Sequence, residues 1–244
     1  MNSSVPDYKR IYTLQDRIIS VIGSHLGEFY LTGGTALGRF YLNHRYSDDL
    51  DFFVNQSPDF SDLSQKIFKL LQQHFRLDES LSVDAPEYKR IWIADEITMK
   101  VEFVNDVSER WGITLKTDIV PVDNPGNILA NKLTAMLSRD EAKDIFDIVT
   151  LADSYSFIWK EVYLEAAKKQ LINEPDIIIR LTTFPVEWLE NQRWLKMKVD
   201  LVQFKEKLER IADDFLFAKE NSLGVGKTPI EKAMPKTKLK NLNQ

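Results

Sequence analysis

Residues 29–53 read FYLTGGTALGRFYLNHRYSDDLDFF, in which a Gly-Gly pair precedes two carboxylates spaced i, i+2 among apolar residues. The first residues are apolar and β-prone, the glycines interrupt them, and the residues that follow carry apolar side chains at helical intervals. The pattern predicts a strand, a turn and a helix. Because glycines let a phosphate approach the backbone, and a helix N-terminus offers unpaired N–H groups, we expect phosphates at Gly33 and Gly34. The Thr35 hydroxyl is a further expected donor.

The second half of this stretch, from Asp49 to Val54, is short, apolar-rich and β-prone, and it predicts a strand. Side chains alternate between the two faces of a sheet, so Asp49 and Asp51 share one face. Carboxylates on a rigid strand suit Mg²⁺, a hard cation that prefers oxygen ligands. Ser47 has the same parity and can donate to a phosphate, whereas Asp48 has the opposite parity and is not assigned to the metal.

Each half of the motif has an ordinary explanation, because Gly-Gly pairs form many turns and Asp-x-Asp occurs by chance. The two halves in this order, within one strand-helix-strand unit, favour a metal-dependent nucleotide site. His44 and Arg45 close the predicted helix, where the helix dipole alone favours cations. Since they directly precede the aspartate strand, we expect Arg45 to face the nucleotide and His44 to be structural.

These residues resemble a known family. Gly33-Gly34-Thr35-Ala36-Leu37 and His44-Arg45-x-Ser47-x-Asp49-x-Asp51-Phe52 are similar to the core of the AbiEii/AbiGii-type toxins, a branch of the polymerase β-like nucleotidyltransferase superfamily. A second block, NKLTAMLSRDEAKDIFD at residues 131–147, resembles the later motif of that family, and the resemblance covers about residues 28–153. It implies that Lys132 neutralises the nucleotide triphosphate and that Asp144 supports the active site.

The residues of the second block on their own predict a pair of amphipathic helices. Lys132 lies beside the apolar stripe of the first helix, a position in which most lysines are solvated, and the upstream motif favours a phosphate contact instead. Asp144 and Asp147 share one helix face by their i, i+3 spacing. Surface charges that pair with Lys143 or Arg139 are the alternative for these two aspartates.

A third carboxylate is expected on a neighbouring strand. Residues 90–93 and 98–104 predict two strands of a hairpin, and Glu102 lies in the second one. Many enzymes of the superfamily carry such a carboxylate as a general base or a further metal ligand. Lys100 shares the face of Glu102, and a Lys–Glu pair on a sheet needs no catalytic explanation, so both interpretations stay open.

The order of the predicted elements defines the fold class. Helix, strand, helix, strand, helix and then two or three strands predict an α/β domain over residues 1–123, and nearly all later segments are helical by pattern. We expect a polymerase β-like mixed-sheet domain followed by a helical domain over residues 124–220. Residues 221–244 contain five lysines and one glutamate, and they predict a basic, disordered tail or a cationic arm for phosphate backbones.

The composition limits the classes of function. The chain has 244 residues, is 43% hydrophobic and 28% charged, and carries a net charge of −5. Three histidines and the absence of cysteine exclude a Cys/His zinc site and a cysteine nucleophile. Because no signal-peptide pattern and no long apolar run occurs, we expect a cytoplasmic protein without a membrane partner.

The sequence therefore predicts a Mg²⁺-dependent nucleotidyltransferase that moves a nucleoside monophosphate from an NTP to an acceptor hydroxyl. The resemblance implies the toxin of a toxin-antitoxin system, acting on tRNA or other RNA, with a cognate antitoxin as its partner. One alternative is an enzyme that modifies a small molecule such as an aminoglycoside. Another is an inactive nucleotide-binding module, against which the intact Asp49 and Asp51 argue.

Overall fold

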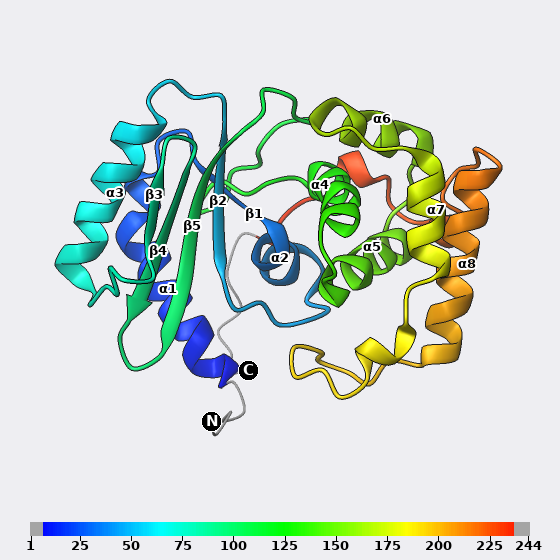
Figure 1. The fold of residues 1–244 in the computed structure, drawn as a ribbon, viewed down its shortest axis with the longest axis horizontal. Coiled ribbons are helices and arrows are strands. Elements are labelled where there is room, and N and C mark those ends of the chain that lie inside the picture. The colour runs from blue at the N-terminus through cyan, green and yellow to red at the C-terminus, as the bar shows by residue number, and fades with distance from the viewer. Residues whose placement is uncertain (1–6, 237–244) are drawn as a thin grey trace. The chain divides into compact units, whose positions relative to one another are not determined.

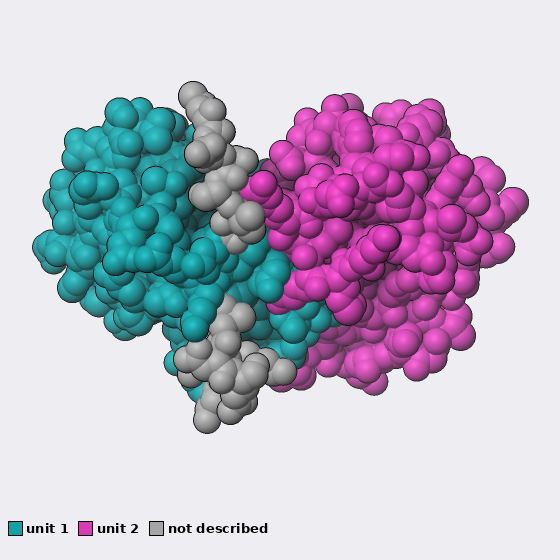
Figure 2. Space-filling view, turned by 90° about the horizontal axis from the view of Figure 1, so that it is seen from below, with its two compact units in different colours: residues 1–108, 114–123, 235–244 teal, residues 109–113, 124–234 magenta. Residues whose placement is uncertain are grey.

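The computed structural model describes residues 7–236, which form two compact units (Figure 2). Of these residues, unit 1 contains 7–108, 114–123 and 235–236, and unit 2 contains 109–113 and 124–234. The chain passes into the main part of unit 2 after Asp123. No helix among residues 7–236 is long and apolar enough to cross a membrane.

Unit 1 is built on a mixed sheet in the order β1-β2-β5-β4-β3 (Figure 1). The strands of the described residues are β1 (Tyr30–Thr32), β2 (Leu50–Asn55), β3 (Val83–Ala85), β4 (Tyr88–Ala94) and β5 (Thr98–Asp106). β2 and β5 are parallel, and the other neighbouring pairs are antiparallel. The predicted α/β class and the predicted hairpin, now β4 and β5, are confirmed.

One face of this sheet forms the core of unit 1. Leu50, Phe52 and Val54 alternate along β2 and are buried, as strand periodicity requires. The Phe52 ring stacks on Phe103 of β5, with ring centroids 5.3 Å apart. Helices α1 (Tyr8–Ile22) and α3 (Phe60–His74) pack together behind the sheet (Figure 1). The alternate residues of β2 therefore point to the opposite face.

The predicted strand-turn-helix after β1 is present, with one difference in the helix. A short helix α2 (Gly33–Ala36) continues as a π-helical segment, η2 (Leu37–Leu42). The Asn43 N–H donates to the Gly38 carbonyl oxygen at 3.0 Å, a wider turn than the α-helix has. Asn43 ends the segment in the left-handed conformation. Single π turns are common beside functional sites, and this one lies between the glycines and the aspartates.

Unit 2 is helical, as the sequence predicts. Its helices within the described residues are α4 (Pro125–Ser138), α5 (Ala142–Ser154), α6 (Trp159–Lys169), α7 (Glu174–Thr182) and α8 (Leu201–Leu216), with short 3-10 turns η3 (Val186–Leu189), η4 (Ser222–Gly224) and η5 (Ile230–Lys232). Asn124 begins α4, because its side-chain oxygen accepts from the Asn127 N–H at 2.9 Å. Pro125 follows at the first helical position, where its missing donor costs nothing.

The prediction of a disordered tail is wrong for residues 221–236. The buried Asn221 amide donates to the carbonyl oxygens of Ala152 and Tyr155, at 2.7 and 2.8 Å. Ile230 is also buried, and the Lys236 N–H donates to the Phe40 carbonyl oxygen at 2.8 Å. Backbone hydrogen bonds and a few apolar side chains order this segment despite its lysines. Residues 237–244 lie outside the described residues.

Candidate active site

A row of side chains crosses the sheet face opposite the core of unit 1. Thr32 of β1 pairs with Asp51 of β2, Asp51 with Glu102 of β5, and Glu102 with Arg90 of β4. Direct cross-strand partners point to the same face, so the four side chains lie side by side. Asp51 and Glu102 are thereby neighbours on two parallel strands. The sequence motif with Asp51 and the predicted third carboxylate come together at this row.

Gly33 lies against Asp51. Its φ is +68°, and a Cβ at this position would lie 2.7 Å from the Asp51 Oδ2 atom. Any other residue at position 33 would have a strained backbone, and its Cβ would clash with the Asp51 carboxylate. Gly33, the first glycine of the motif, therefore allows the Asp51 carboxylate to lie beside the start of α2.

Gly34 lies against two further residues of the motif. A Cβ on Gly34 would be 2.3 Å from an Arg45 guanidinium nitrogen and 3.0 Å from the Ser47 hydroxyl oxygen. Arg45 is only 2% exposed, and its Nη1 donates to the Tyr46 carbonyl oxygen at 2.8 Å. The structure thus brings Arg45 and Ser47 to the N-terminal end of α2, where the sequence predicts phosphate binding.

The Thr35 hydroxyl differs from its predicted role as a phosphate donor. Thr35 is fully buried, and its Oγ1 donates to the Asp49 carbonyl oxygen at 2.5 Å. Position 35 faces inward from α2, so the hydroxyl is used to fix the backbone of the aspartate segment. Thr35 is a positioning residue in this structure.

Gln15 of α1 supports the same segment, and sequence reasoning missed it. Its buried amide donates to the carbonyl oxygens of Ser47 and Asp49, at 3.0 and 3.3 Å. Its Oε1 accepts from Arg39 Nη1 at 3.0 Å, and the other end of that guanidinium pairs with Asp16. The available signal was a polar residue on the otherwise apolar face of the first helix.

Asp49 and Glu102 share one ammonium group. Lys100 Nζ lies 3.3 Å from Asp49 Oδ2 and 2.6 Å from Glu102 Oε2. The Asp49 side chain stays 40% exposed, whereas that of Glu102 is 14% exposed. Burial lowers the pKa of Lys100, but the hydrogen bond with Glu102 and the charges of Asp49 and Asp51 raise it above the usual value overall.

Glu102 accepts hydrogen bonds from three side chains. Besides Lys100, Arg90 Nε donates at 3.0 Å and the Tyr88 hydroxyl donates to the same oxygen as Arg90. Burial alone raises the pKa of Glu102, but these donors lower it below its ordinary value. Burial and Glu102 in turn raise the pKa of Tyr88 to about 12. A carboxylate stabilised in this way is a weak proton acceptor.

The donor set at the sheet face fits a hard divalent cation. Asp49 and Asp51 offer carboxylate oxygens, and Gly33 leaves the space beside Asp51 Oδ2 that a side chain would fill. Among residues 7–236, no group of three or more His, Cys, Asp or Glu side chains is arranged as a metal cage. Two carboxylates completed by water and phosphate oxygens are the usual arrangement for Mg²⁺ at nucleotides.

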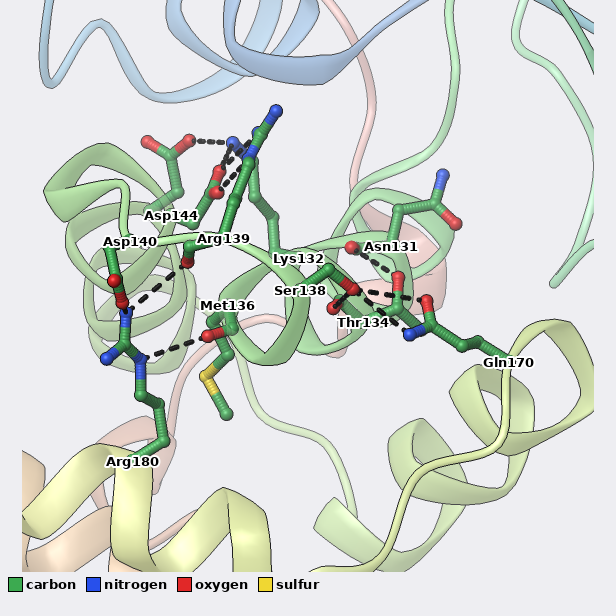
Figure 3. Close-up of polar contacts among 11 residues, drawn as sticks. Asn131, Lys132, Thr134, Met136, Ser138, Arg139, Asp140, Asp144, Gln170 and Arg180 are labelled. Atoms are coloured by element: carbon green, nitrogen blue, oxygen red, sulfur yellow. Dashed lines mark hydrogen bonds and ion pairs between the residues drawn. The ribbon is translucent and has the colours of Figure 1, made fainter.

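The predicted residues of the second block lie in unit 2, where they form a buried charge network (Figure 3). Lys132 of α4 places Nζ 2.6 Å from Asp144 Oδ1 and 2.7 Å from Asp147 Oδ2, both on α5. Arg139 Nε donates to Asp144 Oδ2 at 2.7 Å. Lys132 is only 6% exposed, in contrast to a solvated lysine, because α4 packs on α5 at this point.

Asp144 is held as an anion inside unit 2. Burial raises its pKa, but the charge of Lys132 and the hydrogen bonds from Arg139 and Lys132 lower it below the ordinary value. Asp144 thus pairs with Arg139, as the alternative expects, but it is buried and is not a surface charge. Asp147, which is also fully buried, completes the pair of carboxylates around the lysine.

Comparisons with known proteins place the chain among nucleotidyltransferases. The family described as "Nucleotidyl transferase AbiEii toxin, Type IV TA system" matches residues 21–221. JHP933 from Helicobacter pylori is similar in structure with a TM-score of 0.56 and 21% identity, over 87% of this chain and 93% of that one. MenT4, a nucleotidyltransferase toxin from Mycobacterium tuberculosis, gives a TM-score of 0.53 and 16% identity, over 88% and 86%. No curated protein matches the sequence. These likenesses confirm the predicted fold class.

Proposed function

The chain belongs to the AbiEii family of nucleotidyltransferase toxins, and on this premise we propose that it transfers a nucleoside monophosphate from an NTP to a hydroxyl group of RNA. Asp49 and Asp51 are the proposed ligands of Mg²⁺. One observation carries the proposal. Gly33 has no side chain, and the Asp51 carboxylate occupies the space that a side chain would fill, at the helix start where a triphosphate is expected.

The proposed reaction is an in-line displacement at the α-phosphorus. The acceptor hydroxyl oxygen forms the new P–O bond, the bond to the bridging oxygen of the β-phosphate breaks, pyrophosphate leaves, and the hydroxyl proton passes to solvent. When bound, Mg²⁺ supplies positive charge to the phosphate oxygens and lowers the pKa of the attacking hydroxyl. Asp49, in the loop before β2, and Asp51, in the strand itself, would hold the ion.

Gly34, Arg45 and Ser47 are the proposed phosphate-binding group. The Arg45 guanidinium and the Ser47 hydroxyl both adjoin Gly34, so donors from the backbone and from two side chains converge there. A buried guanidinium binds phosphate oxygens strongly because little water competes for it. Glu102 is proposed to orient Lys100 and Arg90 rather than to remove the proton, since three donors already stabilise its charged form.

Lys132 remains the proposed partner of the leaving pyrophosphate. An ammonium group has three N–H donors, and the ion pairs with Asp144 and Asp147 use two of them. We propose that the third donor meets a phosphate oxygen, and that the two carboxylates fix its direction. Asp144 would then support the active site by positioning Lys132.

The acceptor and the partner rest on membership of the family. Because the family consists of toxins of a toxin-antitoxin system, we propose an RNA acceptor, with tRNA the first to test, and a cognate antitoxin that counteracts the activity. The wild-type protein is incubated with each α-labelled NTP, Mg²⁺ and total RNA, and in parallel with aminoglycosides. We expect label in RNA that depends on Mg²⁺. If only the aminoglycosides became labelled, the acceptor would be a small molecule and not RNA.

Two variants link that activity to the site. Asp51→Asn is expected to abolish transfer while far-UV circular dichroism stays unchanged, because it removes a ligand charge without creating a cavity. Asp84→Asn is the matched control, since Asp84 belongs to the same sheet and its exposed carboxylate pairs with Lys89. Transfer by the Asp51 variant at the wild-type rate would contradict the metal assignment.

A further inference from the structure

Lys100 bridges two carboxylates of the candidate site, because its Nζ contacts both Asp49 and Glu102. It lies on the same sheet face as both, with Trp92 as its cross-strand neighbour. The charges of Asp49, Asp51 and Glu102 all act on its ammonium group. One fixed positive charge is thus surrounded by the carboxylates that are proposed to bind a metal and by the carboxylate beside them.

The ammonium group is well fixed in this position. The Lys100 side chain is only 23% exposed, and the 2.6 Å hydrogen bond to Glu102 is supported from the far side by Arg90 and Tyr88, which bind the other Glu102 oxygen. Glu102 therefore anchors Lys100, while the longer 3.3 Å contact reaches the more exposed Asp49. Of the two carboxylates, Asp49 is the easier one for Lys100 to release.

This arrangement has an electrostatic consequence for a divalent cation. A metal ion on Asp49 must compete with Lys100 for the same carboxylate and must tolerate a positive charge close by. A triphosphate changes this balance, because its negative charges offset both the metal ion and the ammonium group. Lys100 then has phosphate oxygens to bind in place of Asp49.

We propose that Lys100 makes metal binding depend on the nucleotide. Without nucleotide it holds Asp49 and disfavours a metal ion bound alone, and with nucleotide it releases Asp49 and donates to a triphosphate oxygen. This inference rests on the proposed function of the same site. It adds a positioning and binding residue to that site and predicts an order of binding, in which the metal enters with the NTP.

The test measures metal binding directly and does not depend on catalysis. Mn²⁺ is titrated by calorimetry into the full-length wild type, Lys100→Met and Lys100→Gln, with and without a non-hydrolysable NTP analogue. We expect both variants to bind Mn²⁺ about tenfold more tightly than the wild type in the absence of nucleotide, a difference of about 1.4 kcal/mol. The analogue should bind about tenfold more weakly to the variants and should improve their metal affinity less.

Lys89→Met is the matched control. Lys89 is also a lysine in this sheet, is only 3% exposed, and pairs with Asp84 at 2.9 Å. It is the cross-strand partner of Phe103, so it lies on the opposite face from Lys100. Lys89→Met should leave both affinities at wild-type values. Lys100→Arg keeps the positive charge and should keep the weak binding of metal alone.

The outcomes separate this inference from the function on which it rests. Equal Mn²⁺ affinities for wild type and both charge-removing variants would overturn it, as would a loss of metal binding like that of Asp51→Asn. Lys100→Gln can still donate to Glu102, so it provides the measurement if Lys100→Met does not fold. If the wild type binds no Mn²⁺ even with the analogue, the proposed metal site fails, and this inference fails with it.

Discussion

At the scale of single residues, Gly33 and Asp51 limit each other. The positive φ of Gly33 and the 2.7 Å that would separate its Cβ from the Asp51 Oδ2 atom leave no room for a larger residue. An alanine there has two costs, backbone strain and displacement of the carboxylate. A second glycine, Gly226, has a similar φ of +75° and no atom within 4 Å of its Cβ position. An alanine at position 226 therefore has the cost of backbone strain alone.

We expect Gly33→Ala to lower the free energy of unfolding by more than the roughly 1–2 kcal/mol of left-handed strain, because the carboxylate must also move. Metal affinity should fall as well. Gly226→Ala should show the strain alone, with metal affinity unchanged. Urea unfolding and Mn²⁺ titration of both variants check this. Equal losses of stability and an unchanged metal site in Gly33→Ala would refute the argument.

Asp144 gives a prediction for pH at the same scale. Its pKa is lowered in the folded protein, so it stabilises unit 2 fully above the ordinary carboxyl pKa and loses this effect as the pH falls through its folded value. Asp144→Asn leaves Lys132 and Arg139 short of a counter-charge, and we expect a loss of about 3 kcal/mol at pH 7. The difference in the free energy of unfolding between the wild type and Asp144→Asn should become smaller below about pH 4.

Asp140→Asn is the control for that measurement. Asp140 lies in the connection between α4 and α5, just before the helix that carries Asp144, and pairs with Arg180, but its side chain is 73% exposed. An exposed pair contributes less than about 1 kcal/mol, so this variant should unfold close to the wild type at both pH values. Urea unfolding at pH 7 and pH 3 gives the four free energies. A constant gap for Asp144→Asn across the two pH values would exclude the buried anion as its cause.

At the scale of elements, strands and helices were predictable because periodicity is a local property of the chain. Asp49 and Asp51 could be placed on one face by parity, and Gly33-Gly34 could be placed at a helix start. Contacts between elements were not predictable in this way. The inward direction of the Thr35 hydroxyl follows from how α2 packs, and the burial of Lys132 follows from how α4 meets α5.

Gln15 illustrates such a contact, since a residue of α1 supports the backbone beside the aspartates. We expect Gln15→Leu to lower metal affinity about tenfold, as the loss of groups that orient metal ligands commonly does. The unpaired carbonyl oxygens should also cost about 1–3 kcal/mol of stability. Thr13→Ala, on the exposed side of the same helix, should change neither quantity. Wild-type metal affinity in the Gln15 variant would show that the segment holds its shape without α1.

At the scale of the whole molecule, residues 221–236 belong to the folded units. Composition suggested a tail because residues 221–244 contain five lysines and only one glutamate, and composition does not report backbone hydrogen bonds. The Ser156 N–H donates to the Thr228 carbonyl oxygen at 3.1 Å, and the Ile230 N–H donates to the Ser156 carbonyl oxygen at 3.0 Å. The chain thus pairs with the connection that follows α5. A role of the lysines in RNA binding is therefore better tested by substitution than by deletion.

Two truncations test this assignment. A chain that ends at Glu220 loses the Asn221 hydrogen bonds and the buried Ile230, and we expect it to lose about 3–5 kcal/mol of stability. A chain that ends at Lys236 keeps every contact described for residues 7–236 and should melt with the full-length protein. Calorimetry gives both melting temperatures. Equal melting temperatures for the two truncations would mean that residues 221–236 contribute nothing to the fold.

A separate measurement tests the lysines. RNA binding at several salt concentrations is compared between the chain that ends at Lys236 and a full-length variant in which serine replaces Lys227 and Lys232. If these two lysines contact phosphates, the serine variant should bind RNA more weakly, with a shallower salt dependence and at unchanged stability.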